Sequence, residues 1–400
     1  MMRTIVTPEM PTRLMPWAPL HPSVGVMPSV AVMSTYPPTH CGLATFASAL
    51  ANGLRAIGAR DVGVIDVSNT ADPIDDPIVV ARLQPGSTRS RVEVARTING
   101  YDFLLLQHEF GIFGGDDGCE ILELLEDVHV PIVVTLHTVP LRATEGQRRV
   151  LEDLARCADV LVAMTNVARE RFLQLYDVEA SKVVVIPHGA TLPASAAEPS
   201  QEAFIFLTWG LLGPGKGIEW MIDAMAMVPE LRGKIRYIVA GQTHPKILAN
   251  DGDGYRDMLK RRSRLLGVDD IVEFDDSYRT LDSLLELIGS ASCVVLPYDS
   301  VDQITSGVLV DALAARRPVI ATAFPHAQEL LEERAGIVVP HHDPVSLATS
   351  IRSVVTDKTR LTAMYDATEG IAREHRWSAV AARYLECGRH LVDAGSVVTS

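Results

Sequence analysis

The sequence contains few cysteines and none of them in a paired spacing. Its five, Cys41, Cys119, Cys157, Cys293 and Cys387, are scattered, with no CxxC pair among them. This pattern favours reduced thiols, and therefore a cytoplasmic location, over a disulfide framework.

Long apolar runs are also absent. No stretch is long enough to span a bilayer, so no transmembrane segment is predicted. Residues 1–28 are interrupted by prolines and lack the apolar core of a secretion signal. We therefore expect residues 1–28 to form an irregular N-terminal arm.

The chain lacks an excess of positive charge. It carries 36 Lys and Arg against 50 Asp and Glu, for a net charge of −14. This balance argues against nucleic acid as the main partner. An anionic substrate would need a local positive site, because no general positive field is available.

Short apolar, β-branched runs alternate with helical patterns along most of the 400 residues. Nearly continuous apolar runs are typical of parallel strands that are covered on both faces. The length exceeds one comfortable core, so two α/β domains with doubly wound parallel sheets are predicted. The expected strands are residues 29–35, 61–67, 102–108, 131–137, 159–164, 182–187, 203–210, 234–241, 271–276, 293–298, 317–324 and 335–340.

A small, proline-containing stretch, TLPASAAEPSQEA, is the best linker in the chain. It predicts an N-terminal Rossmann-like domain over residues 29–195 and a C-terminal one over residues 203–374. Residues 375–400 form a long amphipathic helical pattern with no strand after it. We expect this helix to pack wherever an apolar groove remains, including on the N-terminal domain.

One glycine-rich turn follows the strand expected over residues 203–210. Gly213, Gly215 and Gly217 keep the turn open, and Lys216 stands at the start of the next helix. Backbone amides at a helix start together with one ammonium group make a phosphate site. A glycine-rich turn with a solvated lysine is the alternative, since the spacing is not that of a P-loop.

The segment QITSGVLVD begins another helix after a strand. Thr305 or Ser306 can cap this helix, and Gly307 lets a ligand approach its first amides. A helix N-terminus favours an anion. The pattern therefore predicts a second group of phosphate contacts.

Two polar residues bracket this helix start. Asp311 lies one turn deeper on the face of Gly307, where it can accept hydrogen bonds from a ribose. Gln303 is placed to reach hydroxyl groups on the other side of the phosphates. An ordinary Ser-capped helix with one exposed Asp is the alternative.

Several polar residues end the strands of the first domain, which suggests a polar cleft at the carboxyl edge of its sheet. A zinc site is the weaker alternative, because the ligands are not closely spaced. These residues are His40, His108, Glu109, His137 and His188. Two other patterns, DGDG at 251–254 and HHD at 341–343, are interpreted as a turn and a helix cap.

Together these stretches resemble the retaining glycosyltransferases of family 4, which have the GT-B fold. The resemblance covers nearly the whole chain from about Val30 onward. It rests on five segments in order: PPTHCGLATF, VTLHT, IPHGA, GLLGPGKGIEWMIDAM and QITSGVLVDALAARRPVIATAFPHAQELL. The family implies two Rossmann-like domains facing a central cleft, a nucleotide-sugar donor, and no metal or other cofactor.

The resemblance also assigns roles by position. Lys216 would hold the donor diphosphate, Asp311 would contact the ribose, and Gln303 would contact the transferred sugar. His137 matches the histidine near the reacting centre, and Glu329 lies in the loop that closes the site. The implied catalytic residues are His137, Lys216 and Gln303. The implied donor-binding residues are Gly42, Gly213, Gly215, Lys216, Ser306, Gly307, Val308, Asp311 and Glu329. The candidate acceptor or sugar contacts are His40, His108, Glu109 and His188.

Two departures from the family pattern concern the donor. Leu211 stands where many members have an arginine beside the diphosphate lysine, and the Glu-x7-Glu motif has become Gln303 and Asp311. Arg142 and Arg279 are candidates to supply the missing charge.

The predicted function is transfer of a hexose from a donor of the GDP-mannose or UDP-glucose type to a hydroxyl acceptor. That acceptor is a glycan, a lipid-linked molecule or a small molecule. A non-catalytic nucleotide-sugar-binding protein and a nucleotide-sugar epimerase on the same fold are the alternatives.

Overall fold

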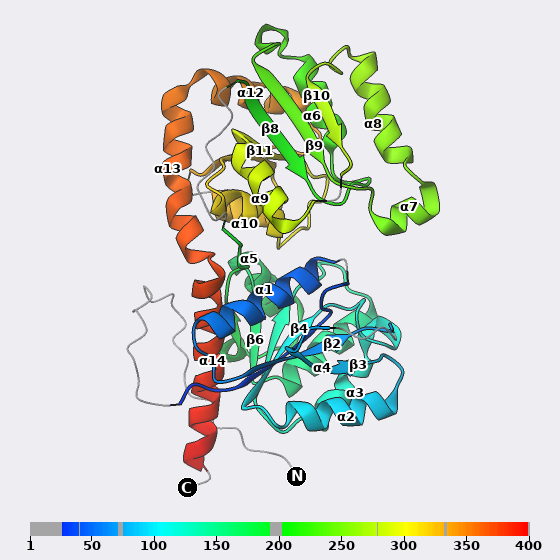
Figure 1. The fold of residues 1–400 in the computed structure, drawn as a ribbon, viewed down its shortest axis with the longest axis vertical. Coiled ribbons are helices and arrows are strands. Elements are labelled where there is room, and N and C mark those ends of the chain that lie inside the picture. The colour runs from blue at the N-terminus through cyan, green and yellow to red at the C-terminus, as the bar shows by residue number, and fades with distance from the viewer. Residues whose placement is uncertain are drawn as a thin grey trace. The chain divides into compact units, whose positions relative to one another are not determined.

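The chain folds into two compact units, shown in the computed structural model of Figure 1. The structure describes residues 26–39, 41–70, 75–192, 202–277, 279–331 and 334–398. The first unit runs to Pro187 and takes up the C-terminal segment from Trp377, whereas the second is His188–Arg376. Most of the expected N-terminal arm and of the expected linker lie outside the described residues.

The first unit contains a parallel sheet with the strand order β3-β2-β1-β4-β5-β6-β7. Its central strands are almost wholly buried, as their continuous apolar sequences predict. The strands are β1 (Val30–Ser34), β2 (Val62–Val67), β3 (Val79–Leu83), β4 (Phe103–His108), β5 (Ile132–Leu136), β6 (Val160–Ala163) and β7 (Val183–Val185).

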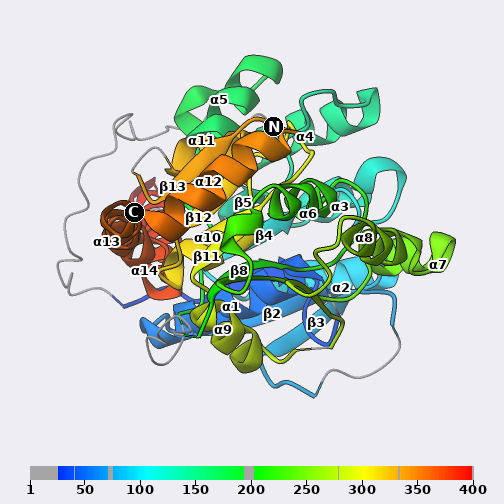
Figure 2. The same ribbon diagram turned by 90° about the horizontal axis from the view of Figure 1, so that it is seen from above.

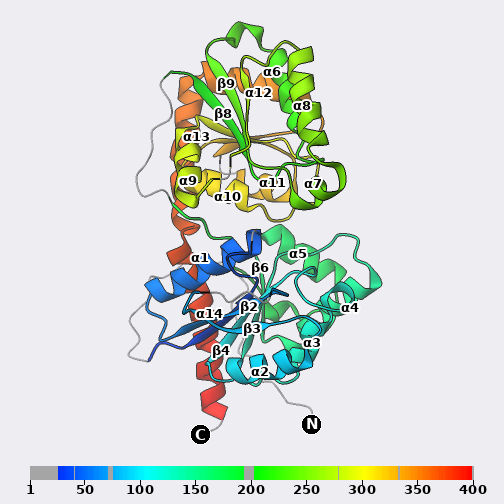
Figure 3. The ribbon, with the colours of Figure 1, turned by 45° about the vertical axis from the view of Figure 1, so that its right-hand side comes forward.

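Two helices that are far apart in the sequence pack together on one face of this sheet. These are α1 (Gly42–Ala56) and the C-terminal helix α14 (Trp377–Val398), which lie side by side in Figures 1 and 3. Their apolar residues share a core with those of β1, β4 and β5. The other helices of the unit are α2 (Thr88–Ile98), α3 (Glu120–Leu125), α4 (Glu145–Cys157) and α5 (Asn166–Leu175).

The second unit contains a parallel sheet with the order β10-β9-β8-β11-β12-β13. Its strands are β8 (Phe204–Trp209), β9 (Ile235–Ala240), β10 (Val272–Asp275), β11 (Cys293–Leu296), β12 (Val319–Thr322) and β13 (Gly336–Val339).

Helices cover both faces of the second sheet. One core contains residues of α6 (Ile218–Ala226), α8 (Gly254–Leu265) and α12 (Pro344–Thr356), and Figure 2 shows α6 beside α8. The opposite core contains residues of α9 (Leu281–Ser290), α10 (Gly307–Ala314) and α11 (Pro325–Leu331). The remaining helices of the unit are α7 (Pro245–Asp251) and α13 (Lys358–Glu374).

Both strand orders reverse once. In the first sheet β1 lies next to β4, and in the second β8 lies next to β11. The loops that follow such a pair of strands turn to opposite faces of the sheet and leave a crevice at its carboxyl edge, where ligands bind in this class of fold. The residues that follow β1, β4, β8 and β11 are therefore the ones that the fold places for function.

The α/β architecture with two doubly wound sheets is confirmed, and every expected strand is present. One strand was missed. β3 is only partly buried and carries Arg82, because it lies at the edge of the first sheet. Its sequence therefore lacks the continuous apolar run by which the other strands were recognised.

Among the described residues, no helix combines the length and the apolar character needed to cross a membrane. The cytoplasmic location stays a prediction.

The attachment of α14 to the first sheet includes one buried polar contact that can be tested. The hydroxyls of Thr135 and Tyr384 lie 3.0 Å apart in the core. Tyr384→Phe should lower the free energy of unfolding by roughly 1–3 kcal/mol, because it leaves the Thr135 hydroxyl without this partner. Adding Thr135→Val should recover most of the loss, as measured by urea denaturation. A double variant whose loss equals the sum of two single losses would contradict this contact.

Candidate functional site

The loop after β8 carries Lys216 and is held against the end of β11. The Asp299 N–H donates to the Gly215 carbonyl at 3.0 Å. Gly217 has a φ of 63°, and a Cβ at this position would lie 1.8 Å from the Pro297 carbonyl oxygen. Only glycine fits here, so the loop approaches the neighbouring strand end more closely than any side chain would allow.

Lys216 is half-buried and has no carboxylate partner among the described residues. Its ammonium nitrogen lies 4.6 Å from the centroid of the Tyr298 ring, within cation–π range. Burial lowers the pKa of Lys216 below its ordinary value. A partly desolvated ammonium without a counter-ion is a site for an anionic ligand.

Tyr298 links this lysine to the start of α10. Its buried ring stacks on Phe324, with centroids 5.5 Å apart. Burial raises the pKa of Tyr298, and the Ser306 side chain beside its hydroxyl offsets part of that increase. Tyr298 therefore has the Lys216 ammonium over its ring and the Ser306 side chain beside its hydroxyl.

The α10 N-terminus leaves two backbone N–H groups available. Ser306 is the N-cap, and its hydroxyl accepts from Leu309 N–H at 3.3 Å. Its own N–H, expected to face the donor, donates instead to His326 Nδ1 at 2.8 Å. Within the described parts of the chain, the N–H groups of Gly307 and Val308 have no acceptor. Two free amides at a helix start favour an anion.

Two further groups near these amides are polar and available. The Thr305 hydroxyl is buried without a hydrogen-bond partner in the part of the chain that the structure describes. Asp311, one turn into α10, is half-buried, and burial raises its pKa to about 7. Its carboxyl group makes no hydrogen bond to the described residues. A ligand with hydroxyl groups could form hydrogen bonds with both the Thr305 hydroxyl and the Asp311 carboxyl group.

The other predicted residues of the second unit lie as follows. The Gln303 amide donates to the Thr305 carbonyl at 3.2 Å, so its side chain folds back on its own loop. Glu329 lies on α11 and is half-buried. His188, expected in the first domain, belongs to the second unit, where its Nε2 lies 3.1 Å from the place of a Cβ on Gly307.

Of the two candidates for the missing positive charge, only Arg279 lies in the same unit as Lys216. Leu211 is 41% exposed. Arg279 forms an ion pair with Asp275 and donates to the Ser283 hydroxyl. Arg142 is exposed and belongs to the first unit.

In the first unit, the loop after β1 leads to the N-terminus of α1, which begins at Gly42. Open space surrounds the position where a Cβ would extend from Gly42. The N-cap is Cys41, whose sulfur accepts from Ala44 N–H at 3.4 Å. His40 lies outside the described residues, so its predicted sugar contact stays a prediction.

His137, at the end of β5, is fixed by two neighbours. Its Nε2 lies 2.9 Å from Gln107 Oε1, and its ring meets Phe46 of α1 edge-on at 4.9 Å between centroids. Glu109, at the end of β4, accepts from the Thr138 hydroxyl and from the Phe110 N–H. The structure thus brings His137 and Glu109 to one edge of the first sheet.

His108 is placed differently from the expectation of a polar contact. Its ring is fully buried between Phe110 and Phe113, and neither ring nitrogen has a partner among the described residues. Burial lowers the pKa of His108 to about 3. As placed, this ring reaches no solvent and offers no surface to a substrate.

The HHD segment, interpreted from sequence as a helix cap, also supports the Lys216 loop. Asp343 caps α12 as expected. In addition, His342 Nε2 lies 3.0 Å from Asp299 Oδ1, which also accepts from the Trp220 indole at 2.8 Å. Nothing in the local sequence indicates these contacts, because their partners lie more than 40 residues away.

Among the described residues, no cluster of three or more His, Cys, Asp or Glu side chains could hold a metal ion.

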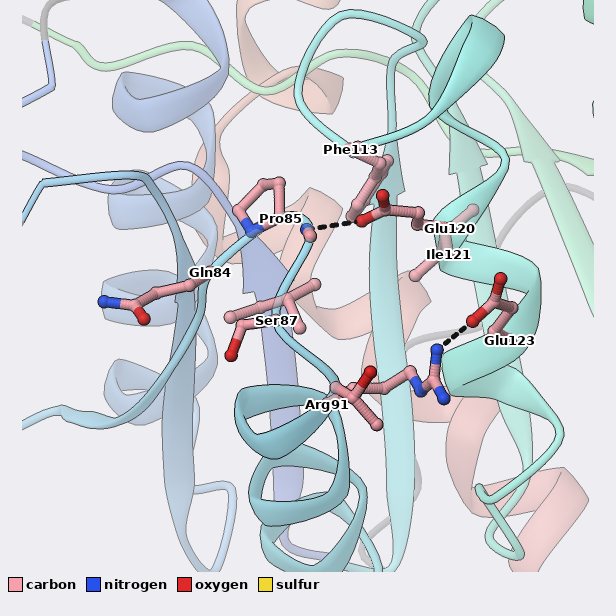
Figure 4. Close-up of a pocket in the computed structure, with 12 residues that line it drawn as sticks. Gln84, Pro85, Ser87, Arg91, Phe113, Glu120, Ile121 and Glu123 are labelled. Atoms are coloured by element: carbon pink, nitrogen blue, oxygen red, sulfur yellow. Dashed lines mark hydrogen bonds and ion pairs between the residues drawn. The ribbon is translucent and has the colours of Figure 1, made fainter.

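A separate cavity of about 110 Å³ lies between the start of α2 and α3 in the first unit (Figure 4). The Gly86 N–H donates to Glu120 at its rim, and Arg91 pairs with Glu123. None of the predicted site residues lines it.

Two family models match the chain, one over each half. Residues 41–192 match the family described as Glycosyltransferase Family 4, and residues 203–357 match the one described as Glycosyl transferases group 1. The second matched stretch contains the Lys216 loop and the start of α10.

Curated relatives include two proteins named D-inositol 3-phosphate glycosyltransferase. The one from Kineococcus radiotolerans is 26% identical over 66% of this chain and 67% of its own length. That from Thermobispora bispora is 28% identical over 64% of each chain. The matches thus span about two thirds of these relatives.

Solved structures with a similar fold include sucrose-phosphate synthase from Thermosynechococcus elongatus. Its TM-score is 0.72 at 19% identity, over 92% of this chain and 99% of the other. Anabaena HepE in complex with UDP and glucose gives a TM-score of 0.70 at 18% identity, over 90% and 99% of the two chains. At these identities the likeness concerns the fold.

The raised pKa of Asp311 predicts how stability changes with pH in the nucleotide-free protein. Its pKa is about 7 in the folded state and 3.8 in its ordinary range, so folding favours the neutral acid. The associated stability is fully present below about pH 4 and is lost as the pH rises through 7. Asp311→Asn should therefore become more stable than the unmodified protein across this window, by about 1 kcal/mol after allowance for solvent screening.

Denaturant midpoints at pH 4, 6 and 8 measure this effect. Asp282→Asn, at an exposed position of α9, is the matched control and should follow the unmodified protein. A constant difference between Asp311→Asn and the unmodified protein at all three pH values would contradict the placement of the carboxyl group.

Proposed function

Because this chain belongs to the group 1 glycosyltransferases of family 4, with the GT-B fold, we propose that it transfers a hexose with retention of configuration. The donor is a nucleoside-diphosphate sugar of the GDP-mannose or UDP-glucose type. One observation carries the donor assignment: among the described residues Lys216 has no carboxylate partner, and the Tyr298 ring beneath its ammonium reaches Ser306 at the start of α10, where the Gly307 and Val308 amides have no acceptor.

These groups offer a diphosphate a positive charge and hydrogen-bond donors. An ammonium and two N–H groups at a helix start can share the negative charge of two phosphates. They are held in place before the ligand arrives, by Gly217 against β11 and by the Ser306 cap. Preorganised donors of this kind stabilise the charge that develops on a leaving group.

The transfer proceeds as a front-face substitution. The bond from the sugar C1 to the leaving phosphate oxygen breaks with oxocarbenium character, and the bond from C1 to the acceptor oxygen forms on the same face. The acceptor proton passes to the departing phosphate, so no protein base is required. Lys216 and the α10 amides stabilise the nucleoside diphosphate, and Gln303 orients the sugar. The role of His137 stays a prediction.

Asp311 is proposed to accept hydrogen bonds from the ribose hydroxyls. Its half-buried carboxyl group lacks a hydrogen-bond partner among the described residues, which leaves it available to such a ligand. The acceptor is proposed to be a small molecule with several hydroxyl groups. D-inositol 3-phosphate is the first to test, since the curated relatives bear that name.

Nucleotide binding tests the donor site. Lys216→Ala should weaken the affinity for GDP, UDP or ADP by roughly tenfold to a hundredfold, because a charge-assisted contact contributes about 1.5–3 kcal/mol. Calorimetric titration of all three nucleotides identifies the preferred base. Lys234→Ala, at an exposed position immediately before β9, is the matched control and should bind as the unmodified protein does. Equal affinity in the two alanine variants would refute the donor site.

The stereochemistry of the product tests the reaction. With an α-linked donor and an accepted hydroxyl compound, the new glycosidic bond should also be α. Proton NMR of the anomeric signal during turnover distinguishes the two outcomes. A β-linked first product would rule out retention, whereas an altered free nucleotide sugar without transfer would indicate epimerisation. Tight binding without either product would point to a binding protein.

A further inference from the structure

His326 holds the segment that leads into α10. It lies near the start of α11 and is only 3% exposed. Its Nδ1 accepts from the Ser306 N–H at 2.8 Å, and its own backbone N–H donates to the Gln303 carbonyl at 3.3 Å. One residue therefore fixes both ends of the stretch Gln303–Ser306.

The hydrogen bond to Ser306 requires a neutral imidazole. Since Nδ1 accepts, the proton of the neutral ring must lie on Nε2. Burial, assisted by the neighbouring His375 and His188, lowers the pKa of His326 to about 3. A charged ring would also face the positive end of α10, which disfavours it further. The acceptor is therefore present at neutral pH.

This contact determines which amides remain for a ligand. Because the Ser306 N–H is occupied by His326 and the Leu309 N–H by the Ser306 hydroxyl, the amides of this turn without an acceptor in the described part of the chain are Gly307 and Val308. Without the imidazole, the Ser306 N–H would lose its buried partner, and the stretch before it would lose one of its two attachments. The direction of the helix-start amides depends on that stretch.

We propose that His326 is a positioning residue for the donor. By accepting from Ser306 and donating to Gln303, it presents the Gly307 and Val308 amides to the diphosphate and sets the place of the Gln303 side chain. The inference rests on the proposed function and deepens it, since it names the residue that prepares the site without touching the substrate.

Substituting His326 by Asn or by Gln distinguishes this positioning role from a role in core packing alone. His326→Asn places an acceptor oxygen where Nδ1 lies, whereas His326→Gln places it nearer to Nε2. The Asn variant should keep the nucleoside-diphosphate affinity within about threefold, and the Gln variant should lose roughly tenfold. His326→Leu, which removes the acceptor, should lose at least as much as Gln.

Affinities of the full chain are measured by titration with the preferred nucleoside diphosphate, well below the melting temperature of every variant. His375→Gln is the matched control. It removes another buried imidazole near His326, whose Nδ1 lies 2.8 Å from the His188 carbonyl oxygen. This control should lower the melting temperature and leave the affinity unchanged. If His326→Leu does not fold, the Asn and Gln pair still gives the answer.

The outcomes are distinct. Equal affinities for His326→Asn and His326→Gln would overturn the inference, whether both are weak or both are unchanged. If Lys216→Ala weakens binding while the His326 series does not, the inference fails and the proposed function stands. If neither weakens binding, the proposed donor site fails, and the inference fails with it.

Discussion

The reversal of strand order in each sheet is the constraint on which the arrangement of polar residues depends. Where β8 lies next to β11, the loops after the two strands leave in opposite directions, and their polar residues meet at one edge. Lys216 comes from one loop and Tyr298 from the other, and the ring of the second lies under the ammonium of the first. The same reversal between β1 and β4 places Gly42 and Glu109 at the edge of the first sheet.

Several polar groups at the carboxyl edge of the second sheet lack a partner among the described residues. Among the described residues, the half-buried ammonium of Lys216 has no carboxylate partner and two amides of α10 lack acceptors, and burial raises the pKa of Asp311. Each of these costs folding free energy in the absence of a ligand. One nucleoside-diphosphate sugar carries the complementary groups for all of them, namely two phosphates and the ribose hydroxyls.

The sequence predicted the parts of this arrangement that depend on local patterns. Apolar runs identified the buried strands, and the glycine-rich turn identified the Lys216 loop. The cap of α10 was expected at Thr305 or Ser306, and it is Ser306. The edge strand β3 was missed because its pattern is half polar. The roles of His326 and His342 were also missed, because each depends on a partner brought close only by folding: Ser306, 20 residues from His326, and Asp299, 43 residues from His342. Periodicity carries no information on such contacts, and the sequence could not indicate that the Ser306 amide is already occupied.

The most direct test of the account is a crystal structure of the chain with a bound nucleoside diphosphate. The account predicts phosphate oxygens within hydrogen-bond distance of the Gly307 and Val308 N–H groups and of the Lys216 ammonium, with the Ser306 N–H still on His326. The ribose should lie against Asp311. A diphosphate bound away from α10, or one that takes the Ser306 amide from His326, would contradict the central claim.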